Sequence, residues 1–188
     1  MRVLLARHGE TDWNAKGRIQ GSSDTVLNSR GREQAVAMAR RLLGMGARGP
    51  SEIYASPLRR AMETAEIVGR ELGITPVIAP ELTELSFGDW EGCSWEEIGR
   101  RWPGQFKSYN ADRRNYAPPN GESYAQMLAR AWPFVDALRK TCGTVVLCVC
   151  HSAVMRGILA QEAGLTVAES YKKIKLPNGS IAELDSLV

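Results

Sequence analysis

Short apolar runs along the chain alternate with longer segments in which apolar residues recur every three or four positions. The short runs are rich in Val, Ile and Leu, and they predict buried β-strands. The run TVVLCVC is apolar almost throughout, which is typical of a central, parallel strand covered on both faces. The expected strands are 2–6, 52–56, 76–79, 144–150 and 179–187, the last of them closing the sheet at its edge.

Four segments have the apolar spacing of an amphipathic helix. Ser56 and Pro57 resemble a helix cap followed by a proline at the first helical position, so the second helix is expected to begin there. Pro133 lies inside the third segment and is expected to kink it. The expected helices are 30–46, 57–72, 123–140 and 152–164.

This alternation of strands and helices is typical of the α/β class with a mostly parallel sheet. In such sheets, ligands bind beside the carboxyl ends of the strands. Arg7 and His8 directly follow the first expected strand, and His151 follows the fourth. Arg59 comes about one helical turn after the second strand. We therefore expect these four side chains to meet at one edge of the sheet.

The composition is that of an ordinary globular protein, with 44% hydrophobic and 24% charged residues among 188, and we expect a single domain over 1–188. The net charge of +3 is dispersed, so no nucleic-acid track is indicated. No apolar stretch reaches membrane-spanning length, and the N-terminal run is too short for a secretory signal. The expected partner is a small molecule, and the oligomeric state stays open, with a homodimer among the options.

Four cysteines, Cys93, Cys142, Cys148 and Cys150, form no C-x-x-C pair, so the sequence predicts neither a zinc nor a redox motif. The absence of such motifs and of a secretory signal indicates a reduced, cytoplasmic protein.

Two arginines and two histidines around one point would form an anion site, because guanidinium groups match phosphate or carboxylate oxygens. A neutral imidazole in that site is also a nucleophile. Phosphoryl transfer further needs a proton for the leaving oxygen, which a carboxylic acid can supply. The acidic residues of PELTELSFGDWEG are the candidates, and periodicity does not choose among them: Glu81, Glu84, Asp89 and Glu91.

The segments LLARHGETDWN, GRIQGSSDTVLNSRGREQA, IYASPLRRAMETA, ELTELSFGDWEG, NGES and VCHSAVMRG resemble the histidine phosphatase superfamily, the phosphoglycerate-mutase-like proteins, in order and spacing. The resemblance extends through most of the chain. It implies a three-layer α/β/α sandwich and a mechanism through a phosphohistidine that needs neither metal nor cofactor.

Carried over to this chain, the resemblance makes His8 the nucleophile and Glu84 the proton donor and later the base. The phosphoryl oxygens would be held by Arg7, Arg59 and His151, with Asn14 assisting. Gln20 and Gly21 match positions at the substrate entrance, and Ser152 stands where the family usually has glycine.

Two alternative activities stay open at this point. A phosphoglycerate-type phosphomutase would share the site, although this chain is short and has ELSFGDWEG near the acid, which resembles the phosphatase branch, including broad-specificity and α-ribazole phosphatases. A cysteine-dependent phosphatase could use Cys150 and Arg156, which are separated by five residues where a strand meets a helix.

Substrate choice is expected to lie in residues 86–120, which hold three of the five tryptophans and end in APPN, the first part of APPNGES. We expect this segment to form a small cap over the sheet edge. Its aromatic residues could stack on the leaving group or form the core of the cap itself, and the second interpretation is preferred.

Overall fold

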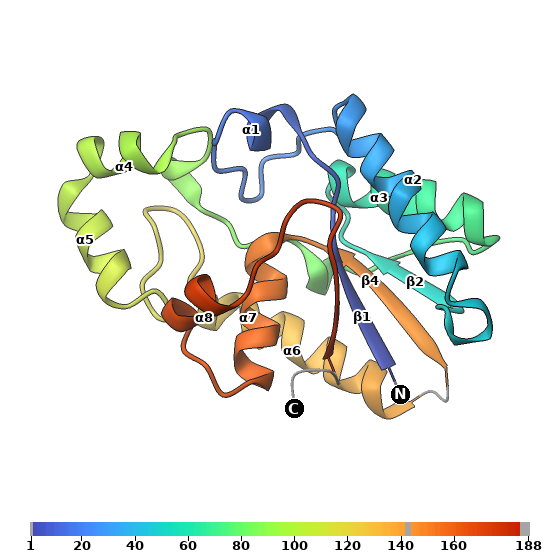
Figure 1. The fold of residues 1–188 in the computed structure, drawn as a ribbon. Helices are drawn as coiled ribbons and strands as arrows, with labels where there is room; N and C mark the ends of the chain where they lie inside the picture. The colour runs from blue at the N-terminus through green and yellow to red at the C-terminus, as the bar shows by residue number, and fades with distance from the viewer. Residues whose placement is uncertain (1, 142–143, 185–188) are drawn as a thin grey trace.

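The sheet of the computed structural model, which describes residues 2–141 and 144–184, has five strands in the order β3-β2-β4-β1-β5 (Figure 1). Strands β1 to β4 run parallel to their neighbours, and only β5 is antiparallel, to β1. The prediction of a mostly parallel sheet with an edge strand at the end of the chain is therefore confirmed. The strands are β1 Arg2–Arg7, β2 Glu52–Ala55, β3 Val77–Ile78, β4 Val145–Cys150 and β5 Ile181–Glu183.

The central strands β1 and β4 are apolar because helices cover both faces of the sheet. Cys148 on β4 packs into the core on one face and its neighbour Val149 into the core on the other, as strand alternation requires. On the first face lie α6 Tyr124–Thr141 and α7 Ser152–Glu162; on the second lie α2 Ser29–Leu43 and α3 Arg59–Leu72 (Figure 1). The expected three-layer sandwich is confirmed.

Helix α3 begins later than the sequence indicated. Its N-cap is Leu58, which contributes no side-chain cap, and Ser56 and Pro57 lie in the turn before it. The expected start at Pro57 is therefore wrong, because the backbone of Leu58 is extended, with φ −65° and ψ 131°, and the helical conformation begins only after it. Helix α6 continues through Pro133, and the expected kink there stays a prediction.

The segment 86–120 forms short helices that lie to one side of the sheet: the 3-10 turn η3 Gly88–Trp90, α4 Trp95–Arg101 and α5 Pro103–Ala111 (Figure 1). Its aromatic rings pack on one another. Trp95 stacks on Tyr109 with the ring centroids 5.7 Å apart, and Trp90 meets Tyr109 edge-on at 5.4 Å. These contacts agree with the preferred interpretation that the aromatics form the segment's own core.

The remaining elements are short: α1 Asp12–Ala15, η1 Gly46–Arg48, η2 Pro80–Leu82 and α8 Val167–Lys173. In the part of the chain that the structure describes, no helix is long and apolar enough to cross a bilayer. Cys142 and the last three residues of the expected closing strand, 185–187, lie outside the described residues.

Candidate active site

The two histidines meet at the carboxyl edge of the sheet, as the sequence predicts. Strands β1 and β4 are paired in parallel, with Arg7 opposite Cys150, so His8 and His151 follow at the same level. The His8 amide donates to the Cys150 carbonyl at 3.1 Å. The two rings are buried, with centroids 5.1 Å apart and planes tilted by 58°.

Local hydrogen bonding leaves one nitrogen of His8 available. Its Nδ1 lies 2.6 Å from the Gly9 carbonyl oxygen, which can only accept, so Nδ1 carries the proton and Nε2 the lone pair. Burial, followed by the charges of Arg60 and Arg7, holds the pKa of His8 well below its usual range. His8 is therefore a neutral imidazole at pH 7, which a nucleophile requires.

Gly9 follows His8 because no larger residue fits there. A Cβ at Gly9 would lie 2.2 Å from the backbone oxygen of Gly31, at the start of α2. The Gly9 amide also donates to the Thr64 hydroxyl at 3.1 Å, which fixes the peptide that orients His8. Close packing between the strand end and α2 thus explains the glycine after the histidine.

The structure contradicts the placement of Arg59 and replaces it with Arg60. The Arg59 side chain is 63% exposed and pairs with Asp24, with Nε 3.0 Å from the carboxylate. Arg60 is fully buried and lines the cavity beside His8. Successive residues of a helix point about 100° apart, so of two adjacent arginines at the start of α3 only one faces the sheet edge.

Arg60 and Arg7 bring positive charge to the histidines. Arg60 donates from Nη1 to the Ser23 carbonyl and from Nη2 to the Gly21 carbonyl, both at 2.7 Å. Burial lowers the pKa of Arg60 to about 10, so it remains charged at neutral pH. Arg7 is tied to the Leu176 carbonyl, and its Nε, like that of Arg60, is buried without a partner among the described residues.

Glu84 is a buried carboxyl at the N-terminus of α7. Its oxygens accept from the amides of Leu85 at 2.9 Å, Ala153 at 3.2 Å and Val154 at 3.3 Å. Burial raises the pKa of Glu84 above its ordinary value, although these amides and the charges of Arg60 and Arg7 oppose the shift. Of the four acidic candidates, Glu84 is the one that lines the cavity with His8.

The polar residues carried over from the resemblance also reach this cavity. The Oδ1 of Asn14 accepts from the Thr11 amide at 3.2 Å and from Asn178 at 3.0 Å, so its amide nitrogen is left to donate. The Oε1 of Gln20 lies 2.8 Å from the Thr11 hydroxyl and also accepts from Thr25, which leaves the nitrogen of Gln20 free in the same way.

The segment 20–23, here called the entrance loop, is held from two sides. Arg60 binds its carbonyls, as described above, and Glu91 binds its amides. The Glu91 carboxylate accepts from the amides of Ser22 and Ser23 at 2.9 Å each, and from the Phe87 amide at 3.0 Å. Glu91 thereby ties the entrance loop to the start of the 86–120 segment, a role that the sequence did not reveal.

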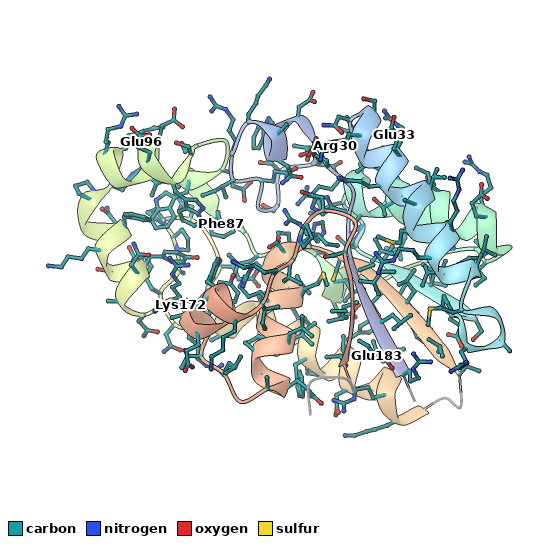
Figure 2. All side chains as sticks on the ribbon, viewed as in Figure 1. Arg30, Glu33, Phe87, Glu96, Lys172 and Glu183 are labelled. Carbon is teal, nitrogen blue, oxygen red and sulfur yellow. The ribbon has the colours of Figure 1, made fainter. Side chains whose placement is uncertain are left out.

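These residues enclose a cavity of about 190 Å³. Phe87, Trp95 and Tyr171 form its aromatic wall, and Figure 2 shows Phe87 between the α4–α5 segment and the rest of the molecule. Besides these three, the lining comprises Arg7, His8, Asn14, Arg18, Ile19, Gln20, Gly21, Arg60, Glu84, Ser152 and Ala153. All predicted site residues except Arg59 therefore lie in or directly beside one cavity, His151 behind it against His8.

Sequence reasoning missed several residues of this site. Asn178, which the sequence presents as part of a turn, donates to Asn14 and to the carbonyls of His8 and Gly9. Ser56 contacts His151 at 2.7 Å. Ser56 follows the end of β2, so the rule that selected His8 and His151 was an available signal for it, whereas Asn178 precedes β5 and the rule does not select it.

The geometry opposes a cysteine nucleophile. Cys150 is fully buried in β4, and burial raises the pKa of its thiol well above the usual range. Arg156 donates to the Ser170 carbonyl at 2.7 Å and lies over the Tyr171 ring at 4.0 Å, so it does not form an anion loop with Cys150. A protonated thiol inside a strand is not a nucleophile.

The arrangement of a neutral imidazole, buried guanidinium groups and a carboxyl of raised pKa defines a site for phosphoryl transfer through histidine. Similarity to known proteins indicates the same class, since residues 3–186 match the histidine phosphatase superfamily (branch 1). The chain belongs to this superfamily.

Among its relatives is the metal-independent phosphoserine phosphatase of Arabidopsis thaliana, 35% identical over 95% of this chain and 74% of the relative. The glucosyl-3-phosphoglycerate phosphatase of Mycobacterium tuberculosis is 39% identical over 73% of this chain, which spans only 60% of that protein's length.

Two solved structures also match over 97% of this chain. A mycobacterial glucosyl-3-phosphoglycerate phosphatase in complex with VO3 has a TM-score of 0.84 at 34% identity, over 91% of that chain. A putative α-ribazole-5'-P phosphatase from Escherichia coli has a TM-score of 0.85 at 28% identity, over 89% of that chain. These relatives favour a phosphatase over the phosphomutase alternative.

Proposed function

We propose that this protein is a metal-independent phosphomonoesterase that hydrolyses small organic phosphate esters through a phosphohistidine on His8. The observation that carries the proposal is the unprotonated Nε2 of His8 beside buried Arg60 and half-buried Arg7, in the same cavity as Glu84. Localisation in the cytoplasm is part of the proposal and rests on the sequence alone.

In the first step, the lone pair of His8 Nε2 attacks phosphorus as the bond from phosphorus to the ester oxygen breaks. The proton of the Glu84 carboxyl passes to the leaving oxygen, so the alcohol departs neutral. The raised pKa of Glu84 supports this role, because the carboxyl must hold its proton until the ester bond breaks.

In the second step, water attacks the phosphohistidine. The Glu84 carboxylate takes the proton of that water, and the phosphorus–nitrogen bond breaks to return His8 as neutral imidazole. Arg7 and Arg60 stabilise the negative charge on the phosphoryl oxygens in both steps, because their guanidinium groups are fixed before substrate arrives. Asn14, Gln20 and the second imidazole, His151, add neutral donors.

The substrate is proposed to be small, because the cavity holds about 190 Å³ and much of it adjoins the phosphoryl site. Phe87 and Trp95 would contact the leaving group, and the 86–120 segment would act as a cap. The names of the relatives refer to phosphoserine, glucosyl-3-phosphoglycerate and α-ribazole-5'-phosphate, which share a phosphomonoester and little else.

A panel of phosphomonoesters, assayed with a chelator present, tests the proposal. The wild-type protein is expected to hydrolyse at least one ester, and His8→Ala to lose at least about 10³-fold in kcat. Cys150→Ser serves as the control for the cysteine alternative and should retain turnover, as should the wild type after iodoacetamide. Turnover that survives in His8→Ala, or that disappears in Cys150→Ser while the fold is intact, would contradict the proposal.

A further inference from the structure

The ring of His151 is fixed at one nitrogen only. Its Nε2 lies 2.7 Å from the Ser56 hydroxyl, whereas its Nδ1 is buried and has no partner among the described residues. A neutral imidazole carries one proton, so which nitrogen holds it determines whether Nδ1 can donate to a bound phosphoryl oxygen or would repel it.

The backbone fixes Ser56 in a position where its hydroxyl can determine which nitrogen of His151 carries the proton. It follows β2 directly, and its amide donates to the Val149 carbonyl of the adjacent strand β4 at 3.0 Å. Because Ala55 and Val149 are partners in the parallel pairing of β2 with β4, the next residues along both strands lie close together. Ser56 is fully buried, so no solvent competes for its hydroxyl.

The contacts of the Ser56 hydroxyl favour one direction for its proton. The Leu58 amide points at the oxygen from 3.3 Å and can only donate, so it uses a lone pair of the oxygen. If His151 Nε2 also carried a proton, the oxygen would accept twice and its own proton would have no acceptor among the described residues. With the Ser56 proton directed to Nε2, the Leu58 amide, the Ser56 hydroxyl and His151 Nε2 are all satisfied, and the ring proton lies on Nδ1.

We propose that Ser56 is the positioning residue of the second histidine: its hydroxyl donates to His151 Nε2 and thereby fixes the Nδ1–H tautomer. The inference rests on the proposed function, because Nδ1–H is then the donor that His151 offers to the phosphoryl group. Burial and the charges of Arg60 and His8 hold the pKa of His151 well below its usual range, so the ring is neutral and the tautomer matters at neutral pH.

The tautomer can be measured directly, because His8 and His151 are the only histidines of the chain. Long-range proton–nitrogen NMR of the uniformly ¹⁵N-labelled protein at neutral pH distinguishes protonated from unprotonated ring nitrogens, and a His8→Gln sample assigns the two rings. The wild type is expected to show His151 with Nδ1 protonated and Nε2 unprotonated. A protonated Nε2 in the wild type would overturn the inference, whether or not any Ser56 variant folds.

Ser56→Ala tests the consequence. We expect His151 to shift toward the Nε2–H tautomer and kcat/KM to fall by about tenfold to a hundredfold, less than or comparable to the loss of one full transition-state donor. Ser170→Ala removes an equally buried hydroxyl that donates to the Val167 carbonyl, and it should change neither the tautomer nor kcat/KM.

An unchanged His151 tautomer in Ser56→Ala would refute the inference, even if activity fell. Failure of the proposed function would look different: His8→Ala would then retain turnover, while the tautomer of His151 in the wild type would still report on Ser56 alone.

Discussion

Two adjacent arginines at the start of α3 differ in burial and in the groups they contact. Arg60 is buried against the cavity, whereas Arg59 is exposed and paired with Asp24. Sequence alone did not separate them, because both follow the same strand and have the same chemistry. They differ in the direction in which each side chain extends from the helix, and that direction depends on the residue at which α3 begins.

We therefore expect Arg60→Lys and Arg59→Lys to differ sharply. A lysine at residue 60 loses the fork that holds two carbonyls of the entrance loop, so kcat/KM should fall by about 10²-fold or more. The matched variant Arg59→Lys should stay within about twofold, since an exposed ion pair contributes little. Steady-state kinetics with one phosphomonoester decides, and equal losses in both variants would contradict the assignment.

The raised pKa of Glu84 sets the direction of the pH dependence. As the acid of the first step, Glu84 must be protonated, so kcat should fall as the pH rises through its pKa in the enzyme–substrate complex. Glu84→Gln should lower kcat and flatten that alkaline limb, with a smaller loss for an ester whose leaving group is already acidic, such as a nitrophenol. An unchanged alkaline limb in Glu84→Gln would contradict the role of this carboxyl.

At the scale of elements, the entrance loop depends on contacts from both sides rather than on its own sequence. Glu91 accepts from the amides of Ser22 and Ser23, and Arg60 donates to two carbonyls of the same loop. The φ angle of Gly21 is +53°, and a Cβ there would lie 2.2 Å from the Glu91 carboxylate. Glycine is thus required where the loop passes this side chain.

Glu91→Gln should weaken the hydrogen bonds that hold the entrance loop, and it changes no group that contacts the reacting atoms. An amide nitrogen in place of one oxygen cannot accept from the loop amides, and hydrogen bonds to a charged group are worth about 1.5–3 kcal/mol. We expect kcat/KM to fall by about tenfold, mainly through KM. Glu96→Gln is the matched control, because Glu96 lies exposed on α4 (Figure 2). Wild-type kinetics in both variants would argue against a role for Glu91.

The elements themselves were largely predictable from the chain. The strand 145–150 and the helices on both sides follow from apolar runs and helical spacing, because burial on two faces leaves a continuous apolar pattern. The start of α3 was not predictable, since Ser56 and Pro57 look like a helix start and the extended backbone of Leu58 has no local signal. The contact of the Ser56 hydroxyl with His151 was not predictable either, because the two residues are 95 positions apart.

On the scale of the whole molecule, some residues of the site were predictable from local sequence patterns, and others are brought to it only by the fold. His8 and His151 were found because both follow strands, and the strand rule is local in sequence. Glu84 was selected by the resemblance, and only the fold explains it, by placing the carboxyl against the first amides of α7. The contribution of Asn178 depends on a turn 164 residues from Asn14 that no local pattern connects to it.

The stability of the whole molecule should also depend on the active-site histidines. Burial lowers the pKa values of both histidines. Below about pH 6.5, the histidines of the unfolded chain are therefore protonated, whereas those of the folded protein stay neutral to lower pH. Their contribution to stability is therefore fully present above about pH 6.5 and is lost as the pH falls, by up to about 1.4 kcal/mol per pH unit for each histidine. Glu84, whose pKa is raised, has the opposite slope in the pH range between its unfolded and folded pKa values.

Urea unfolding at pH 7.5 and pH 5.5 measures this linkage. The free energy of unfolding of the wild type should fall between the two, and the fall should be smaller in the double variant His8→Gln/His151→Asn. Since the chain has no other histidine, an equal fall in both proteins would show that the buried rings are not the cause.

The central claim is that the phosphoryl group passes through the neutral nitrogen of His8. The most direct measurement is mass spectrometry of peptides from the protein quenched in base during turnover of a phosphomonoester, since a phosphohistidine survives base and is lost in acid. The account predicts phosphate on His8 in the wild type and in Ser170→Ala, and none in His8→Ala. Phosphate on another residue, or steady turnover in His8→Ala, would contradict it.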